Sequence, residues 1–364
     1  MVDVHEREAA SPVHLVGSMQ VPSAEDALRA TGPIVGDRVA ALPDGEPAER
    51  SAWVHFLAYR TFYPSLAFRT VQRPAPRDGH SSWYARGIEE EWSFEVIDAN
   101  AELEFPYLGY AAAARDSYRL LQRLREEGVV PPGVGLQVAI PFPDGAVQPF
   151  FRRPADFELV AAAYRRAAVR EIQELLTFIP PAELRLQWDV CWEVLNLEGV
   201  TPWVPDSDHW TRYAEAVAEL SRGVPESVAV GYHLCYGNWE ARHMVEPRDL
   251  GLCVRMANAA VEHAAHDVAF FHMPVPIDRD DDAFFAPLRD LRTGSARIYL
   301  GLVHAQDGLE GASRRVAAAR TALRSFGVAT ECGMGYVPEA ELDSALRLHR
   351  DIADQLLDGA NAAS

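Results

Sequence analysis

The residues of this chain best suited to chemistry are a histidine and two cysteines that stand where apolar runs end. His233 and Cys235 are separated by one residue at the end of the run SVAVGYHLC, residues 227–235, and Cys332 ends the run GVATEC, residues 327–332. Alternate residues of a β-strand share a face, so the imidazole and the thiolate of the first pair can reach one ion. Two thiolates and an imidazole suit zinc, with iron as the alternative metal. We therefore expect a metal site if these runs are strands whose ends meet.

Further polar residues stand where the other apolar runs end. They are Ser18, Glu46, Asp189, His272 and His304. A single histidine in such a place is often only structural, and Glu46 could belong to a turn before a helix start, where acidic residues are favoured. Asp189 follows a strongly apolar run, and a buried carboxylate needs a partner. If Glu46 and Asp189 face one pocket, they would bind a cationic amine.

The elements that could bring these residues together are indicated by an alternation of short apolar runs and amphipathic stretches. The apolar runs after about residue 130 are 135–143, 184–190, 227–235, 267–273, 297–304 and 327–332. Stretches of helical period lie between them, a pattern typical of parallel βαβ units. Two more strand-like runs, at 12–18 and 38–46, bring the total to eight, and the glycine-rich first turn of an open dinucleotide-binding sheet is missing. The sequence therefore predicts an α/β fold of the (β/α)8 TIM-barrel type, in which the carboxyl ends of the strands share one face.

The stretch from about 47 to 133 is too long for a single βα unit. It contains a helical pattern at 51–62, strand-like alternation within 81–105 and another helical pattern at 110–128. We interpret it as an insertion after strand 2 that covers the mouth of the barrel, within a single domain that spans residues 1–364.

Composition and charge narrow the class of protein. The chain has 364 residues, of which 48% are hydrophobic, with 53 acidic and 34 basic residues and a formal net charge of −19. A strongly acidic chain is a poor partner for nucleic acid or for an anionic membrane surface. The sequence has neither a membrane-length apolar run nor an N-terminal signal pattern, and its four cysteines are widely spaced. We expect a cytoplasmic protein with reduced thiols.

Several of these segments resemble cobalamin-independent methionine synthase. HLCYGNW resembles the family's H-x-C-Y segment, TECGMG its D-C-G segment, and LVGSMQ its strand-one G-S-F. PDGEPAERSAW is similar to the H-G-E-x-x-R segment, with one extra residue before the arginine, and LQWDVCWE to Q-I-D-E-P, without the E-P. The resemblance covers most of the chain but only the C-terminal, catalytic barrel of the long enzymes. The wider superfamily also includes epoxyalkane:thiol transferases and uroporphyrinogen decarboxylase-like barrels.

The resemblance implies roles for individual residues. His233, Cys235 and Cys332 match three of the family's four zinc ligands, and alignment of AFFHM places His272 where the family has a glutamate ligand. The alternative is that His272 points elsewhere and water completes a three-ligand site. The other matched positions are Ser18, Glu46 and Asp189, which correspond to residues that bind the amino-acid end of homocysteine, and His304, which corresponds to a histidine that assists proton transfer. Asp189 and His304 are therefore the candidate catalytic residues.

The mechanism implied is a zinc-activated thiolate of homocysteine, or of a related small thiol, that attacks an alkyl donor. The donor could be a folate or a corrinoid, although the missing N-terminal barrel and the acidic chain make folate polyglutamate a poor fit. Exchange of a carboxylate ligand for neutral His272 would make a bound thiolate less basic. A metal-dependent lyase, a hydrolase or a non-haem iron oxygenase is therefore the alternative enzyme class. A non-catalytic binder of a small amino acid or metal is the third possibility.

Overall fold

The central feature of the fold is a curled parallel sheet of seven strands. The computed structural model describes residues 4–75, 85, 88–201, 208–238 and 241–361. The strands of the sheet, in spatial order, are β1 Ala41–Pro43, β4 Gly135–Pro141, β5 Leu184–Val190, β6 Ala229–Leu234, β7 Phe270–Pro274, β8 Arg297–Val303 and β9 Gly327–Thr330. Every neighbouring pair is parallel. All seven residues of β5 are buried, as expected for a parallel strand covered on both faces.

The two edges of the curled sheet are joined by the N-terminal segment 12–19. On one side Val13 and Met19 form single parallel bridges with Val328 and Met334. On the other side the amides of Val13 and Met19 donate to the carbonyls of Arg38 and Gly45, which flank β1. The segment thus lies between the two edges of the seven-stranded sheet, and this arrangement is compatible with the predicted TIM-barrel type of fold.

Segment 12–19 is not the regular strand predicted at 12–18, because glutamine side chains, and not a neighbouring backbone, donate hydrogen bonds to some of its carbonyls. The side-chain Nε2 of Gln137 donates to the carbonyls of Leu15 and Val16 at 2.9 and 2.8 Å. The side-chain Nε2 of Gln187 donates to the carbonyl of Val16 at 2.7 Å. The other predicted strands are confirmed. Their bounds agree within a few residues, except that β1 is much shorter than the predicted run 38–46.

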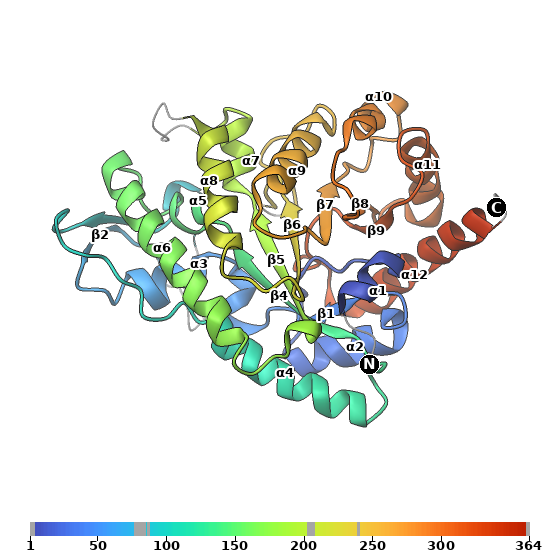
Figure 1. The fold of residues 1–364 in the computed structure, drawn as a ribbon, viewed down its shortest axis with the longest axis horizontal. Coiled ribbons are helices and arrows are strands. Elements are labelled where there is room, and N and C mark those ends of the chain that lie inside the picture. Colours follow the sequence, from blue (N-terminus) through green and yellow to red (C-terminus); the bar gives the residue numbers. More distant parts are fainter. Residues whose placement is uncertain (1–3, 76–84, 86–87, 202–207, 239–240, 362–364) are drawn as a thin grey trace.

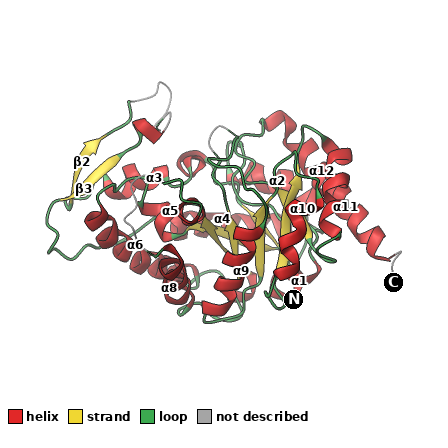
Figure 2. Ribbon diagram, turned by 90° about the horizontal axis from the view of Figure 1, so that it is seen from above, coloured by secondary structure: helices red, strands yellow, loops and turns green. Residues whose placement is uncertain are grey.

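Helices form a ring around the sheet (Figures 1 and 2). The longer ones are α2 Ala24–Val35, α4 Tyr110–Glu126, α6 Pro154–Leu175, α8 His209–Ser221, α9 Gly251–His263, α11 Gly308–Arg320 and α12 Glu339–Asn361. Packing runs from α2 through α4, α6 and α8 to α9, and α11 packs on α12, which packs back on α2. The first and last long helices are therefore side by side, as a closed barrel requires.

Shorter elements complete the molecule. They are α1 Val4–Ala10, η1 Ala48–Ala52, α3 His55–Leu57, η2 Ala58–Phe62, η3 Ile88–Glu90, α5 Pro143–Val147, η4 Pro181–Glu183, α7 Trp192–Leu197, α10 Asp282–Phe285 and η5 Ala286–Asp290. An antiparallel hairpin of β2 Phe68–Gln72 and β3 Ser93–Val96 stands apart from the main sheet, beside α3 and α6 (Figure 2). Within the described residues, no helix is both long and apolar enough to cross a membrane.

Buried polar and charged side chains surround Arg185 inside the curled sheet. The Arg185 guanidinium makes a bidentate ion pair with Glu8 at 2.7 Å, contacts the Nδ1 atom of His14 at 2.8 Å and lies 3.4 Å above the Phe270 ring. A buried arginine with these partners is fully satisfied, so this layer serves the fold.

Candidate metal centre

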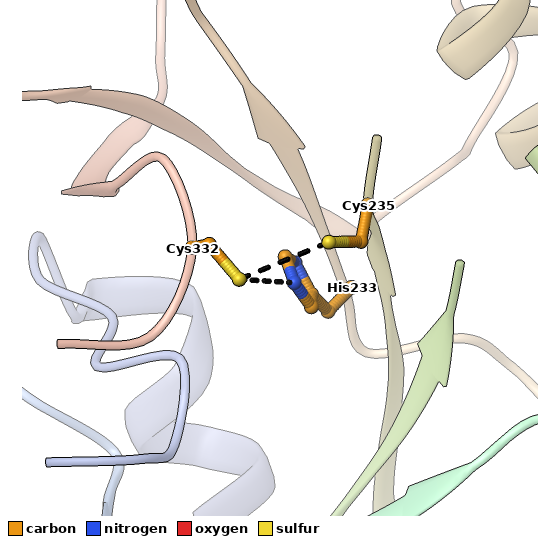
Figure 3. Close-up of side chains that lie close together, drawn as sticks. All are labelled: His233, Cys235 and Cys332. Atoms are coloured by element: carbon orange, nitrogen blue, oxygen red, sulfur yellow. Dashed lines mark hydrogen bonds between the residues drawn. The ribbon is translucent and has the colours of Figure 1, made fainter. Parts of the chain in front are cut away.

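Three of the predicted ligands converge at the carboxyl end of the sheet. His233 and Cys235 come from the end of β6, and Cys332 comes from the loop that follows β9 (Figure 3). One donor atom from each lies within 4.8 Å of the other two. The Sγ atoms of Cys235 and Cys332 are 3.8 Å apart, and the Cys332 Sγ is 3.6 Å from the His233 Nε2. The structure therefore brings these three residues together as the sequence predicted.

These separations fit a tetrahedral zinc ion. Two sulfurs at about 2.3 Å from zinc, at the tetrahedral angle of about 109°, lie about 3.8 Å apart, and a sulfur and an imidazole nitrogen lie about 3.6 Å apart. Both values agree with the distances between the side chains. Two of the three donor separations therefore fit zinc, and the third, between the Cys235 Sγ and His233, lies within 4.8 Å. A further ligand would complete a tetrahedral set.

Without a cation, the two thiols hold their protons strongly. The pKa of Cys332 lies well above its usual value because of its hydrogen bond with Cys235 and because of burial. The pKa of Cys235 is raised first by a hydrogen bond with the Cys191 thiol and then by burial. A divalent cation reverses this balance, since it binds thiolates and displaces their protons.

Cys191 is a neighbour of this centre that was not predicted from the sequence motifs. It follows β5 and belongs to the same buried cluster as Cys235, with Cys332 packed against the cluster. The sequence shows that Cys191 lies two residues after Asp189. Its contact with Cys235 depends on how β5 pairs with β6, which the sequence does not show.

His272 lies behind His233 and not beside the thiols. The register of the sheet pairs the two histidines directly across β6 and β7. The Nδ1 atoms of the two rings are 2.7 Å apart, and the Nε2 of His272 is 3.0 Å from the carbonyl oxygen of Thr330. Both ring nitrogens of His272 are thus engaged away from the sulfurs, and burial lowers the pKa of its ring well below the usual value.

The carboxylates of Glu46 and Asp189 line the same cavity as the thiols. Burial raises the pKa of Glu46 to about 8, with a further contribution from the charge of Asp189. Burial also raises the pKa of Asp189 to about 7, although Gln187 and Trp53 donate hydrogen bonds to its two oxygens at 2.8 and 3.3 Å. Two interacting carboxyl groups with raised pKa values favour a cationic ligand, because a cation would stabilise both charges.

The loop that carries Glu46 is held in an unusual conformation. Glu46, Ala48 and Trp53 have positive φ values of 52, 57 and 45°, which non-glycine residues rarely adopt. Asp44 anchors the loop through two bonds from the Arg50 guanidinium, at 3.1 and 2.7 Å, and one from the Glu46 amide at 3.0 Å. Strained residues that persist in a well-anchored loop are common at functional sites.

Ser18 lies between the loop that carries Glu46 and the loop that carries Cys332. Its carbonyl accepts a hydrogen bond from the Met334 amide at 2.7 Å, and a Cβ atom on Gly333 would come within 2.2 Å of the Ser18 hydroxyl. A side chain at position 333 would therefore displace the serine hydroxyl from its present position. Ser18 lines the cavity, as expected for a substrate-binding residue.

His304 is placed differently from the other candidates. It follows β8, and its Nε2 donates to the carbonyl of Val275 at 2.9 Å. Burial, together with the charge of Arg315, lowers the pKa of its ring to about 4. It is not among the described residues that line the cavity.

The cavity itself has a volume of about 540 Å³, which is within the range of small-molecule sites. One part of its wall is formed by Ser18, Glu46, Asp189 and the three metal-ligand candidates. Another part comes from the segment between β1 and the hairpin, through Trp53 and His55. Trp53 was not predicted from the sequence, because its contact with Asp189 spans 136 residues.

The similarity of this chain to known proteins lies in its fold and not in its sequence. No protein-family model and no curated protein matches the sequence. The structure of a B12-independent methionine synthase from Shewanella sp. W3-18-1, in complex with selenomethionine, is similar at a TM-score of 0.62 and 12% identity, over 96% of this chain and 99% of that one. A putative vitamin-B12 independent methionine synthase from Listeria monocytogenes is similar at a TM-score of 0.56 and 15% identity, over 95% and 97% of the two chains. The chain therefore shares its fold, over nearly its whole length, with proteins described as B12-independent methionine synthases.

Proposed function

We propose that this chain is a zinc-dependent thiol alkyltransferase, most simply a methyltransferase that acts on homocysteine or a related small thiol. The observation that carries the proposal is the clustering of His233, Cys235 and Cys332, in which two donor separations equal those of a tetrahedral zinc site and the third lies within 4.8 Å. Zinc bound there would lower the pKa of a substrate thiol and hold its thiolate for attack on an alkyl donor.

The residues of the chain would bind the rest of the substrate. Glu46 and Asp189 favour a cation, and an amino-acid thiol carries an ammonium group. Ser18, which lines the same cavity, would offer a hydroxyl to the same end of the substrate. The Shewanella protein was solved with an amino acid, selenomethionine, which supports an amino-acid ligand. Of the two candidate catalytic residues we assign substrate contact to Asp189 alone, because His304 is absent from the described cavity wall.

Access to the site would be limited by the predicted insertion. We infer that residues of the 47–133 region cover the barrel mouth, because Trp53 and His55 from this region form part of the cavity wall. An alkyl donor such as a corrinoid or a folate would have to reach the sulfur past them. The four free cysteines support a reducing location, such as the cytoplasm.

The test is metal analysis of the purified protein, followed by cobalt substitution. We expect stoichiometric zinc, and a change in the sulfur-to-cobalt absorption when homocysteine is added, because its thiol would become a further sulfur ligand. Cys235→Ser and Cys332→Ser should lose the metal, whereas the matched control Cys253→Ser, buried in α9, should keep it. Full zinc occupancy in either ligand variant would refute the site. Stoichiometric iron would instead favour a lyase, hydrolase or oxygenase, and lack of any metal would favour a non-catalytic binder.

A further inference from the structure

Two histidine rings lie end to end behind the thiols. The Nε2 atom of His233 faces the Cys332 Sγ at 3.6 Å, and its Nδ1 atom faces the Nδ1 of His272 at 2.7 Å. The Nε2 of His272 then meets the carbonyl oxygen of Thr330 at 3.0 Å. His233 is 3% exposed and His272 is fully buried. The chain of contacts therefore runs from the end of β9 through β7 and β6 to the ligand cluster.

The hydrogens on the ring nitrogens of His233 and His272 can be assigned from the donors and acceptors that each nitrogen contacts. A carbonyl oxygen only accepts, so the Nε2 of His272 carries a hydrogen. A neutral imidazole carries one such hydrogen, so the Nδ1 of His272 is the acceptor in the 2.7 Å contact, and the Nδ1 of His233 is the donor. The remaining nitrogen, the Nε2 of His233, then has a free lone pair on the side of Cys332.

A cationic His272 would change this assignment, but its surroundings oppose it. The ring is fully buried, and its centroid lies 5.4 Å from that of the tilted His14 ring, which already contacts the Arg185 guanidinium at 2.8 Å. A second cation in this interior would face a like charge without water to screen it. The neutral assignment is therefore the stable one.

We propose that His272 is a positioning residue that fixes the tautomer and the ring orientation of His233, and is not itself a metal ligand. An ion at the Nε2 edge of His233 lies on the opposite side of that ring from His272. Metal-bound histidines commonly donate their other N–H to a partner that holds the ring, and here the partner is a second histidine. The inference rests on the proposed zinc site for its purpose, while the tautomer itself is a property of the metal-free chain.

The pairing of the strands makes this arrangement possible. The sheet register places His233 opposite His272, and both strands are fully buried, so the two rings enter the same layer of the interior. Thr330 is the last residue of β9 and supplies the terminal carbonyl two residues before Cys332. The end of the hydrogen-bond chain and a thiol ligand are thus fixed by the same short segment.

The first experiment is long-range ¹H–¹⁵N NMR of the histidine rings in the metal-free protein. We expect His233 to be protonated at Nδ1 and His272 at Nε2. Protonation of His233 at Nε2 instead would overturn the inference. This measurement needs neither metal nor activity, so its outcome is separate from the fate of the proposed function.

The second experiment compares two variants by their affinity for zinc and cobalt. In His272→Asn the side-chain oxygen takes the place of Nδ1 as acceptor, so affinity should stay within a few-fold of the wild type. His272→Leu removes the acceptor and should lose roughly tenfold to a hundredfold, the range observed for such partners. His349→Leu, which removes another fully buried histidine in α12, is the control and should bind metal normally. A folded His272→Leu protein with wild-type affinity would overturn the inference, and if that variant does not fold, the asparagine variant and the ring NMR decide.

Discussion

The carboxyl pair predicts that affinity for an amino-acid thiol depends steeply on pH. Glu46 has a raised pKa of about 8, so it is protonated and neutral at lower pH and cannot pair with an ammonium group. Its ionised fraction rises from about 1% at pH 6 to about 9% at pH 7 and 50% at pH 8. Ionisation of Glu46 alone should therefore strengthen binding of the amine about 50-fold from pH 6 to pH 8, which corresponds to about 2.3 kcal/mol, and ionisation of Asp189 should add to this.

The assay should separate the amine from the thiol. Calorimetric titration of the zinc-loaded protein with homocysteine and with 4-mercaptobutanoate, its des-amino analogue, gives a ratio of affinities at each pH. The two ligands share the thiol and the carboxylate, so effects of pH on sulfur binding largely cancel in that ratio. In Glu46→Gln only Asp189 remains, and the midpoint should fall towards its pKa of about 7, with a lower plateau. A ratio that stays constant from pH 6 to pH 8 in the wild type would refute the amine site.

Three further predictions concern the same cavity. Cys332→Ser should abolish stoichiometric metal while circular dichroism and thermal unfolding remain close to wild type, because a core of this size does not depend on a metal for folding; loss of the fold would contradict this. Trp53→Phe removes the indole N–H that donates to Asp189, and should weaken homocysteine binding about fivefold, the worth of about 1 kcal/mol, without changing binding of the des-amino ligand. Chelation of the metal followed by mild oxidation should crosslink Cys235 to Cys332 or Cys191, detectable by mass spectrometry of peptides, while zinc-loaded protein should be protected; equal oxidation of both forms would argue against metal-bound thiols.

Much of the fold could be predicted from the sequence because parallel strands are buried on both faces and appear as continuous apolar runs. The run 184–190 coincides with β5 for this reason. Segment 12–19 was harder, since glutamine side chains of β4 and β5 satisfy some of its carbonyls and leave only single bridges. No local pattern encodes such a replacement.

The site was predictable where a residue's place on its strand decides its role. His233, Cys235 and Cys332 meet because strand ends share one face. The place of His272 depends instead on the register between β6 and β7, which puts it against a second histidine. His304 also follows a strand, but its ring turns to the Val275 carbonyl. The strand register and the side-chain rotamers are set by packing across the sheet. They could therefore not be predicted from a single sequence.

Segment 12–19 joins the two edges of the curled sheet, and this has a consequence for the order in which the protein matures. Ser18 is made long before Cys332, and the Met334 amide that donates to the Ser18 carbonyl follows Cys332 in the sequence. A metal ion could therefore be bound by all three ligand candidates only after Cys332 has been made and segment 12–19 has paired with the residues that follow β9. In a small zinc domain the metal drives folding, but here uptake of the metal would follow the folding of the curled sheet.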